Sequence, residues 1–213
     1  MMRYVATLAF AFSAVALSSS PDYSKVNGSI VVQAGQQAGD VETVNGSITV
    51  GHDSRVNGVE TVNGSVHLEE QASATSAETV NGAIVIGAQA QVRDGASTVN
   101  GELTLGKGAR VGGKLENVNG KVSLQGATVD GGIETTNGDV YVASGSHVEG
   151  GIHVAKNQGW SWGGKSKAVR VTIESGAIVN GPLEFERAVD LYVGSGVILA
   201  PVEGVQPQRF TLQ

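Results

Sequence analysis

The hydrophobic positions of this chain follow a short pattern that returns many times along the sequence. Apolar and polar residues alternate over three to five positions, as in ETVNGSITV, which is typical of β-strands with one buried face. Most of these segments contain an Asn-Gly pair. The asparagines of these pairs are spaced by 18 or 19 residues, and they are Asn27, Asn45, Asn63, Asn81, Asn100, Asn119 and Asn137. This regular spacing indicates an internal repeat.

The Asn-Gly pair allows two interpretations of the strands around it. Between apolar residues it is the usual signal of a two-residue β-hairpin, which would produce an antiparallel meander. A second aliphatic set argues against hairpins, because residues such as Val56, Val92 and Val111 follow another aliphatic residue by six positions. The series Val44, Val50 and Val56 predicts three short sides in each turn, each with an inward aliphatic residue.

We therefore expect an all-β fold, a single-stranded parallel β-helix that forms a triangular β-solenoid with about 18–19 residues per coil. Its handedness stays open, because parallel crossovers prefer the right hand whereas a six-residue spacing is typical of left-handed coils. Small residues at Ser54, Ala90 and Ala109 stand two positions before an inward valine, where a corner leaves little room.

Equivalent residues of successive coils should stack about 4.8 Å apart. Stacked asparagines can hydrogen-bond along the axis, which predicts a structural ladder. Its rungs would be Asn45, Asn63, Asn81, Asn100, Asn119 and Asn137. In the alternative interpretation, each asparagine only tolerates a left-handed backbone at an exposed corner.

The repeat also predicts a column of like charges. Its members are Glu42, Glu60, Glu78, Glu116 and Glu134, with Ser97 as an interruption. Carboxylates at coil spacing form either a solvated face or a Ca²⁺ or Mg²⁺ site, for which Glu42, Glu60 and Glu78 are the candidate ligands. Threonines beside them form a parallel row without the paired columns of an ice-binding face.

The ends of the chain differ from the repeats. Residues 1–16, extending to about residue 20, combine Arg3 with an apolar run from Tyr4 to Leu17 and resemble a cleavable secretory signal peptide. The sequence has no cysteine, so packing alone must stabilise an exported chain. We expect a periplasmic, secreted or cell-surface protein with no transmembrane segment after signal cleavage.

A break in the repeat divides the remainder. Residues 21–154 carry the β-helix repeats, 155–168 form an inserted loop, 169–205 supply the last coils and a C-terminal cap, and 206–213 are a tail. Val179 to Gly181 is another Val-Asn-Gly triplet, so the segment after the loop should supply about two more coils. The insertion contains the candidate recognition residues Trp160, Trp162, Lys156, Lys165 and Lys167. The tryptophans either form a binding platform or fasten the loop to the solenoid.

The ETVNGSI and TTNGDV phrases in residues 24–154 resemble a bacterial putative-adhesin domain family of unknown function. The phrases SGAIVNGPLEF and YVGSGVILAPV in residues 174–202 are more loosely similar to the bactofilins. The second resemblance implies triangular coils and end-to-end polymerisation. Neither family implies catalytic residues or a cofactor.

Composition and charge exclude some classes of partner. The net charge is −6 and the 14 Lys and Arg residues are scattered, which excludes a nucleic-acid partner. The histidines at 52, 67, 147 and 153 are expected on the surface, where His147 and His153 would lie on adjacent sides. The sequence favours a non-enzymatic structural or adhesin-like envelope protein that contacts copies of itself end to end, an envelope glycan or another protein. The alternatives are a polysaccharide-binding module using Trp160 and Trp162, and a β-helical enzyme.

Overall fold

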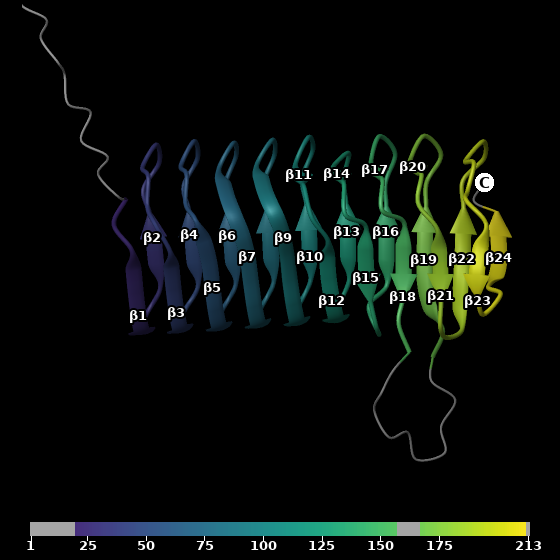
Figure 1. Ribbon diagram of the computed structural model, residues 1–213, viewed down its shortest axis with the longest axis horizontal. Coiled ribbons are helices and arrows are strands. Elements are labelled where there is room, and N and C mark those ends of the chain that lie inside the picture. Colours follow the sequence, from purple (N-terminus) through teal and green to yellow (C-terminus); the bar gives the residue numbers. More distant parts are fainter. Residues whose placement is uncertain (1–19, 157–166, 212–213) are drawn as a thin grey trace, which may run out of the picture.

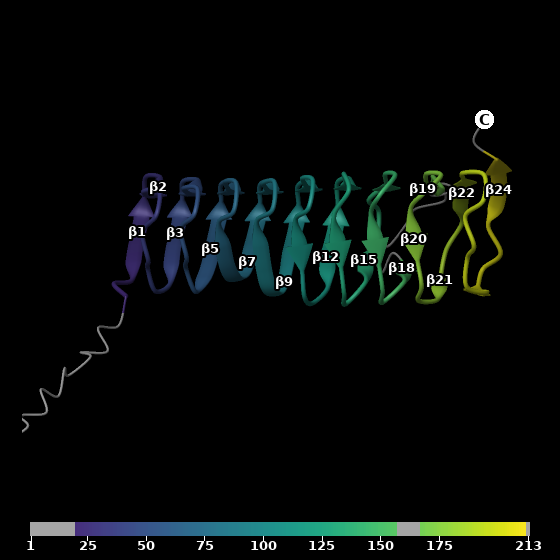
Figure 2. The same cartoon turned by 90° about the horizontal axis from the view of Figure 1, so that it is seen from above.

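Short strands that pair with the strands one turn earlier and one turn later build the fold. The computed structural model describes residues 20–156 and 167–211, and its regular structure in these ranges is entirely β-strand. Figures 1 and 2 show the coils in a single row, with the first and last strands at opposite ends. All strand pairs are parallel, as the repeat predicts for a β-solenoid.

Each coil has three sides. Strands of the first side are β1 (Tyr23–Asn27), β3 (Val41–Asn45), β5 (Gly58–Asn63), β7 (Ser73–Asn81), β9 (Gln91–Asn100), β12 (Leu115–Asn119), β15 (Ile133–Thr135), β18 (Ile152–Val154), β21 (Leu183–Phe185) and β23 (Val202–Gly204). Strands of the second side are β2 (Ile30–Val32), β4 (Ile48–Val50), β6 (Val66–Leu68), β8 (Ile84–Ile86), β10 (Leu103–Leu105), β13 (Val122–Leu124), β16 (Val140–Val142), β19 (Val169–Ile173), β22 (Val189–Val193) and β24 (Gln208–Thr211). The third side consists of β11 (Arg110–Val111), β14 (Thr128–Val129), β17 (His147–Val148), β20 (Ile178–Val179), isolated bridges and the first residues of β7 and β9.

The core is a stack of aliphatic columns between the three sides. One column on the second side runs Ile48, Val66, Ile84, Leu103 and Val122 in register, and all five side chains are buried. The predicted small residues Ser54, Ala90 and Ala109 are buried as well. Burial of whole columns provides the main stabilisation in this chain, which has no cysteine.

The first side corrects one predicted column. Val44 and its equivalents point outward, and Val44 is 40% exposed, whereas Val50 and Val56 are buried as expected. Alternation along β3 places Val41 and Thr43 in the interior and Glu42 and Val44 outside. The threonine row is therefore buried, contrary to the expectation of a surface row.

The C-terminal part holds one further correction. The Val-Asn-Gly triplet at Val179 to Gly181 lies on the third side, where β20 pairs with β17 and Asn180 bonds His147 and Glu149. The stretch expected to be a tail, 206–213, contains β24, which pairs with β22 and places Phe210 on Tyr192 with ring centroids 4.6 Å apart. The last coils therefore extend beyond residue 205.

The buried threonine row and the outward valine row of the first side can be tested by substitution. Thr79→Val should destabilise the protein by about 1 kcal/mol or more, because it removes a part-buried hydrogen bond from the Thr79 hydroxyl to the Gly64 carbonyl. Val80→Thr, one residue further and 40% exposed, should change the free energy of unfolding by less than about 0.5 kcal/mol. Urea melts that ranked the two variants in the opposite order would contradict the observed alternation.

Candidate functional site

The corner between the first and second sides carries the asparagine ladder that the repeat predicts. Each asparagine after the first donates its Nδ2–H to the Oδ1 of the equivalent asparagine one coil earlier, at 2.9–3.0 Å. The rungs are Asn27, Asn45, Asn63, Asn81, Asn100, Asn119 and Asn137. All seven are exposed, so the ladder is a surface feature. It runs along the lower edge in Figure 1, where β1, β3, β5, β7, β9 and β12 end.

The glycine after each asparagine from Asn45 onward is required by close stacking on the preceding coil. A Cβ on Gly64 would lie 2.0 Å from the Gly46 carbonyl oxygen, and one on Gly82 would lie 1.9 Å from that of Gly64. These corner carbonyls also accept the buried threonine hydroxyls, for example Thr61 to Gly46 at 2.9 Å. The corner thus combines an outer amide ladder, a glycine stack and an inner hydroxyl row.

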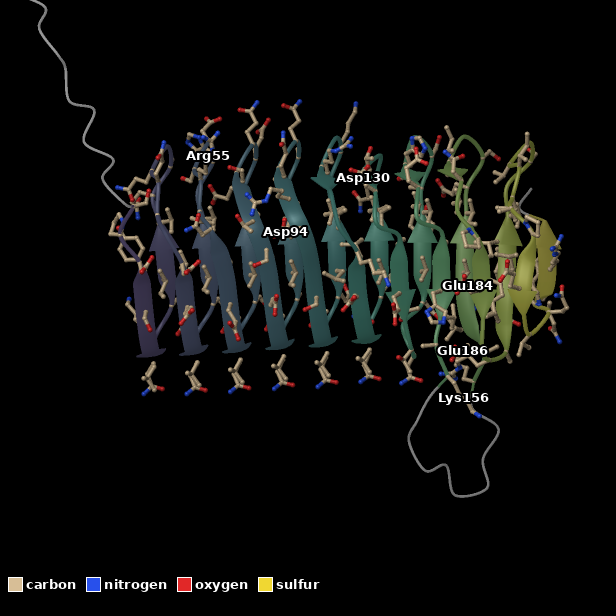
Figure 3. The ribbon with its side chains drawn as sticks, viewed as in Figure 1. Arg55, Asp94, Asp130, Lys156, Glu184 and Glu186 are labelled. Carbon is tan, nitrogen blue, oxygen red and sulfur yellow. The ribbon has the colours of Figure 1, made fainter. Side chains whose placement is uncertain are left out.

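The ladder ends where the repeat is interrupted. Thr135, Val154 and Phe185 are paired in register, and Asn137 lies two residues after Thr135. Lys156 and Arg187 lie two residues after Val154 and Phe185, so they occupy the next two ladder positions. Lys156 is the last described residue before the segment 157–166, and Figure 3 shows it at the ladder edge below Glu186. Arg187 reaches back across one coil and donates Nη1–H to the free Oδ1 of Asn137. The guanidinium therefore caps the acceptor end of the ladder.

Arg187 is held by two further bonds. Its Nη1 donates to the Thr136 carbonyl at 2.8 Å, and its Nη2 donates to the Lys167 carbonyl at 2.9 Å. Beside it lies a hollow of about 400 Å³. The lining residues are Gly120, Lys121, Asn137, Asp139, Lys167, Ala168, Val169 and Arg187.

The structure describes two of the five predicted recognition residues. Trp160, Trp162 and Lys165 lie outside the described residues. Lys156 and Lys167 lie on either side of the segment 157–166, and Lys167 lines the hollow. Sequence reasoning missed Arg187 and Lys121, which join Lys167 only because coils far apart in sequence are stacked. The ladder position of Arg187, two residues past Phe185, was the available signal.

The glutamates stack in register on the outer face of the first side, as the repeat predicts. Glu42 pairs with Glu60, Glu60 with Glu78, and Glu116 with Glu134. The column continues with His153, Glu184 and Glu203 in the last coils. Among the described residues, no three His, Asp or Glu side chains are grouped closely enough to hold a metal ion, so the candidate ligands Glu42, Glu60 and Glu78 form a row and not a cluster.

The histidines lie on the surface. His147 in β17 is on the third side and His153 in β18 is on the first side, so the pair occupies adjacent sides as expected. His147 Nε2 lies 2.9 Å from Glu149 Oε1, and His153 Nε2 lies 3.4 Å from Glu186 Oε1. Both are surface contacts, the first within one coil and the second between two coils.

Two carboxylates near the insertion have lowered pKa values. The backbone N–H of Lys156 donates to Glu186 and lowers the pKa of that carboxyl, with a smaller contribution from His153. The Tyr141 hydroxyl and the Ser144 N–H lower the pKa of Glu174, and the same tyrosine bond raises the pKa of Tyr141. Because both Glu pKa values fall below the ordinary 4.5, these contacts stabilise the fold fully above that pH and are lost as the pH falls through the lowered values.

Comparison with known proteins finds no similar protein. No protein-family model, no curated protein and no solved structure matches the chain. The described ranges also contain no helix long and apolar enough to cross a membrane.

The ladder should stabilise the fold in proportion to the bonds that each rung makes. Asn100→Ala removes two amide bonds, to Asn81 and from Asn119, and should cost about 1 kcal/mol because the ladder is exposed. Asn27→Ala removes only one bond, at the ladder end, and should cost less.

Asn57→Ala is the matched control, since Asn57 lies on another corner and its side chain makes no hydrogen bond to the described residues. Denaturant melts should rank the free-energy loss in the order Asn100, Asn27, Asn57. Equal stability of the Asn100 and Asn57 variants would show that the ladder bonds add nothing.

Proposed function

We propose that this chain is an exported, non-enzymatic structural or adhesin-like β-solenoid of the bacterial cell envelope that acts through its lateral columns. The observation that carries the proposal is the unbroken stacking of identical surface residues, above all the asparagine ladder. A straight stack of coils presents the same chemical group about every 4.8 Å. Such a surface suits repetitive partners, for example a polysaccharide or a fibrous protein.

Export is supported by the sequence of the first residues, where a basic residue precedes an apolar run. The resemblance of the repeats to bacterial putative adhesins supports the same location. A signal peptide would be cleaved near residue 16 and would deliver the chain to the periplasm or the cell surface. The solenoid needs no disulfide there, because its columns are closed by packing.

The two ends of the solenoid decide whether copies of the chain can assemble end to end, which the sequence left open. Apolar residues are exposed at both ends, including Val26 at 66% and Ile198 at 90%, and they favour contact between copies. Charged residues at inward positions oppose a continuous junction. Lys25 is paired with the buried Thr43, and Arg209 is paired with the fully buried Leu191.

The register shows what a head-to-tail junction would bury. Arg209 ends the column that begins with Ile30, so an in-register copy would place the guanidinium against that isoleucine. A buried charge without a partner is costly, and inward-pointing charges at sheet edges protect against edge pairing. We therefore assign the activity to single solenoids and their lateral columns.

The polysaccharide-binding alternative based on Trp160 and Trp162 concerns residues outside the described ranges. The described part of the chain offers it a different location, the hollow beside Arg187. A β-helical enzyme gains no favourable observation from the described residues.

Cell fractionation tests the location. The full chain expressed in a Gram-negative bacterium should appear in the periplasm, outer membrane or medium, shortened at its N-terminus by about 16–20 residues. The matched control lacks residues 2–16 and should stay in the cytosol. Cytosolic retention of the full chain would contradict the proposal.

Light scattering tests the role of the ends. The unaltered protein should remain monomeric at micromolar concentration, whereas Arg209→Leu should associate because it restores the apolar column of Ile30 and Leu191. Arg55→Leu, on the outer face of the third side, is the control and should remain monomeric. Fibres formed by the unaltered protein would show that the terminal charges do not block assembly.

A further inference from the structure

The hollow at the end of the asparagine ladder is a concentration of uncompensated positive charge. Lys121, Lys167 and Arg187 line it, and Asp139 is the single carboxylate among the lining residues. This local excess of two positive charges contrasts with the net charge of −6 for the whole chain. The volume of about 400 Å³ falls in the range of small-molecule sites.

Arg187 is fixed in position without being neutralised. Its hydrogen bonds to described residues go to the Thr136 and Lys167 carbonyls and the Asn137 amide oxygen, which are all uncharged. Three other cations of the described residues have carboxylate partners, namely Arg93 with Asp94, Arg110 with Asp130 and Lys114 with Glu134. Within the described ranges Arg187 has no such partner. Its Nε–H also makes no bond to a described residue, which leaves a donor for a ligand.

The two lysines also lack carboxylate partners within the described ranges. The Lys121 ammonium lies over the Tyr141 ring, 4.7 Å from its centroid. That contact orients the side chain but leaves its charge in place. Lys167 is exposed beside the guanidinium that binds its carbonyl.

Asp139 supplies a different kind of group. Its Oδ1 accepts the backbone N–H of Arg170 at 2.8 Å. Its Oδ2 accepts no hydrogen bond from the described residues and is available as an acceptor for a hydroxyl. The hollow therefore combines cationic donors with one anionic acceptor.

We infer that this hollow binds an acidic sugar, with the ligand carboxylate at Arg187, Lys121 and Lys167 and a ring hydroxyl at Asp139. A planar carboxylate matches the donor geometry of a guanidinium, and the lysines add long-range attraction. Asp139 accepts from a sugar hydroxyl but repels a second anionic group, which favours a uronic acid over a phosphate. The inference concerns the purified protein and does not depend on its export.

A membrane surface fits the same residues less well. Attraction to anionic lipids uses clusters of four to eight cations on a surface that can approach a plane. Here three cations surround a hollow, and Asp139 lies among them. The neighbouring first side adds a column of glutamates, including Glu134 and Glu184. A single anionic sugar residue avoids that repulsion.

Titration calorimetry with the full purified chain tests the inference. The probes are a galacturonic acid trisaccharide, the neutral galactose trisaccharide and inorganic phosphate at moderate salt. The uronate should bind at least tenfold more tightly than either of the other two. Arg187→Gln should weaken uronate binding at least tenfold, and Arg93→Gln, a cation paired with Asp94 elsewhere, should leave it unchanged.

Arg187→Gln also removes bonds that hold Thr136 and Lys167, so a second variant separates binding from folding. Lys121→Gln with Lys167→Gln keeps those bonds and should weaken binding several-fold at an unchanged melting temperature. Unaltered uronate binding in that double variant would overturn the inference, as would equal affinity for the neutral trisaccharide. Tighter binding of phosphate, or of phosphatidylglycerol vesicles, with loss in the same variants would also overturn it in favour of a different ligand.

Discussion

Backbone hydrogen bonding between successive coils is the constraint on which the rest of this structure depends. Each strand pairs in parallel with the equivalent strand of the next coil, so a residue in the regular repeats lies directly beside its counterpart 18 or 19 positions away. A side chain is therefore selected for compatibility with copies of itself. Aliphatic residues meet this condition in the interior, where Ile48, Val66 and Ile84 form one continuous column.

Different side chains respond differently to being stacked. Asparagine is self-complementary, because each amide has a donor for one neighbour and an acceptor for the other, and the result is a ladder of seven rungs. Glycine is required at the next position, since a Cβ would collide with the preceding carbonyl. Glutamate is not self-complementary, and its column remains on the exposed face, where water screens the repulsion between carboxylates.

A ladder of this kind has unlike ends, and they lie in different environments. The amide donors face the first coil, while the last acceptor, Asn137 Oδ1, is met by Arg187. A cation is the natural partner for the acceptor end, because it also balances the aligned amide dipoles. The same residue anchors the chain after the insertion through Lys167 and leaves its charge directed at a hollow.

The sequence predicted the features that depend on periodicity. Parallel coils, the asparagine ladder and the glutamate column all follow from the spacing of repeated letters. The sequence predicted that the Val44 column points inward, but in the structure the Thr43 column does. Hydropathy favours burying Val44, whereas the corner needs the Thr43 hydroxyl inside to bond the Gly28 carbonyl. Arg187 was missed because it meets Asn137 across 50 residues, and the insertion between them obscures its ladder position.

The position of Asn180 in the coil could not be predicted for a related reason. A Val-Asn-Gly triplet has the same letters at any corner, and the insertion had already shifted the count of residues, so its position in the coil could not be read from the triplet itself. The pairing of β20 with β17 decides that position. Periodicity therefore predicts a column only while the residue count between coils is maintained.

Removal of whole coils is the most direct test of register as the organising constraint. Deletion of residues 64–100 joins Asn63 to Gly101 and removes two coils while preserving every column. Small-angle X-ray scattering should show a folded rod shortened by roughly 10 Å, and circular dichroism should retain its β-signal. Deletion of residues 64–72 removes half a coil and should abolish folding. A folded half-coil variant, or an unfolded two-coil variant, would contradict the account.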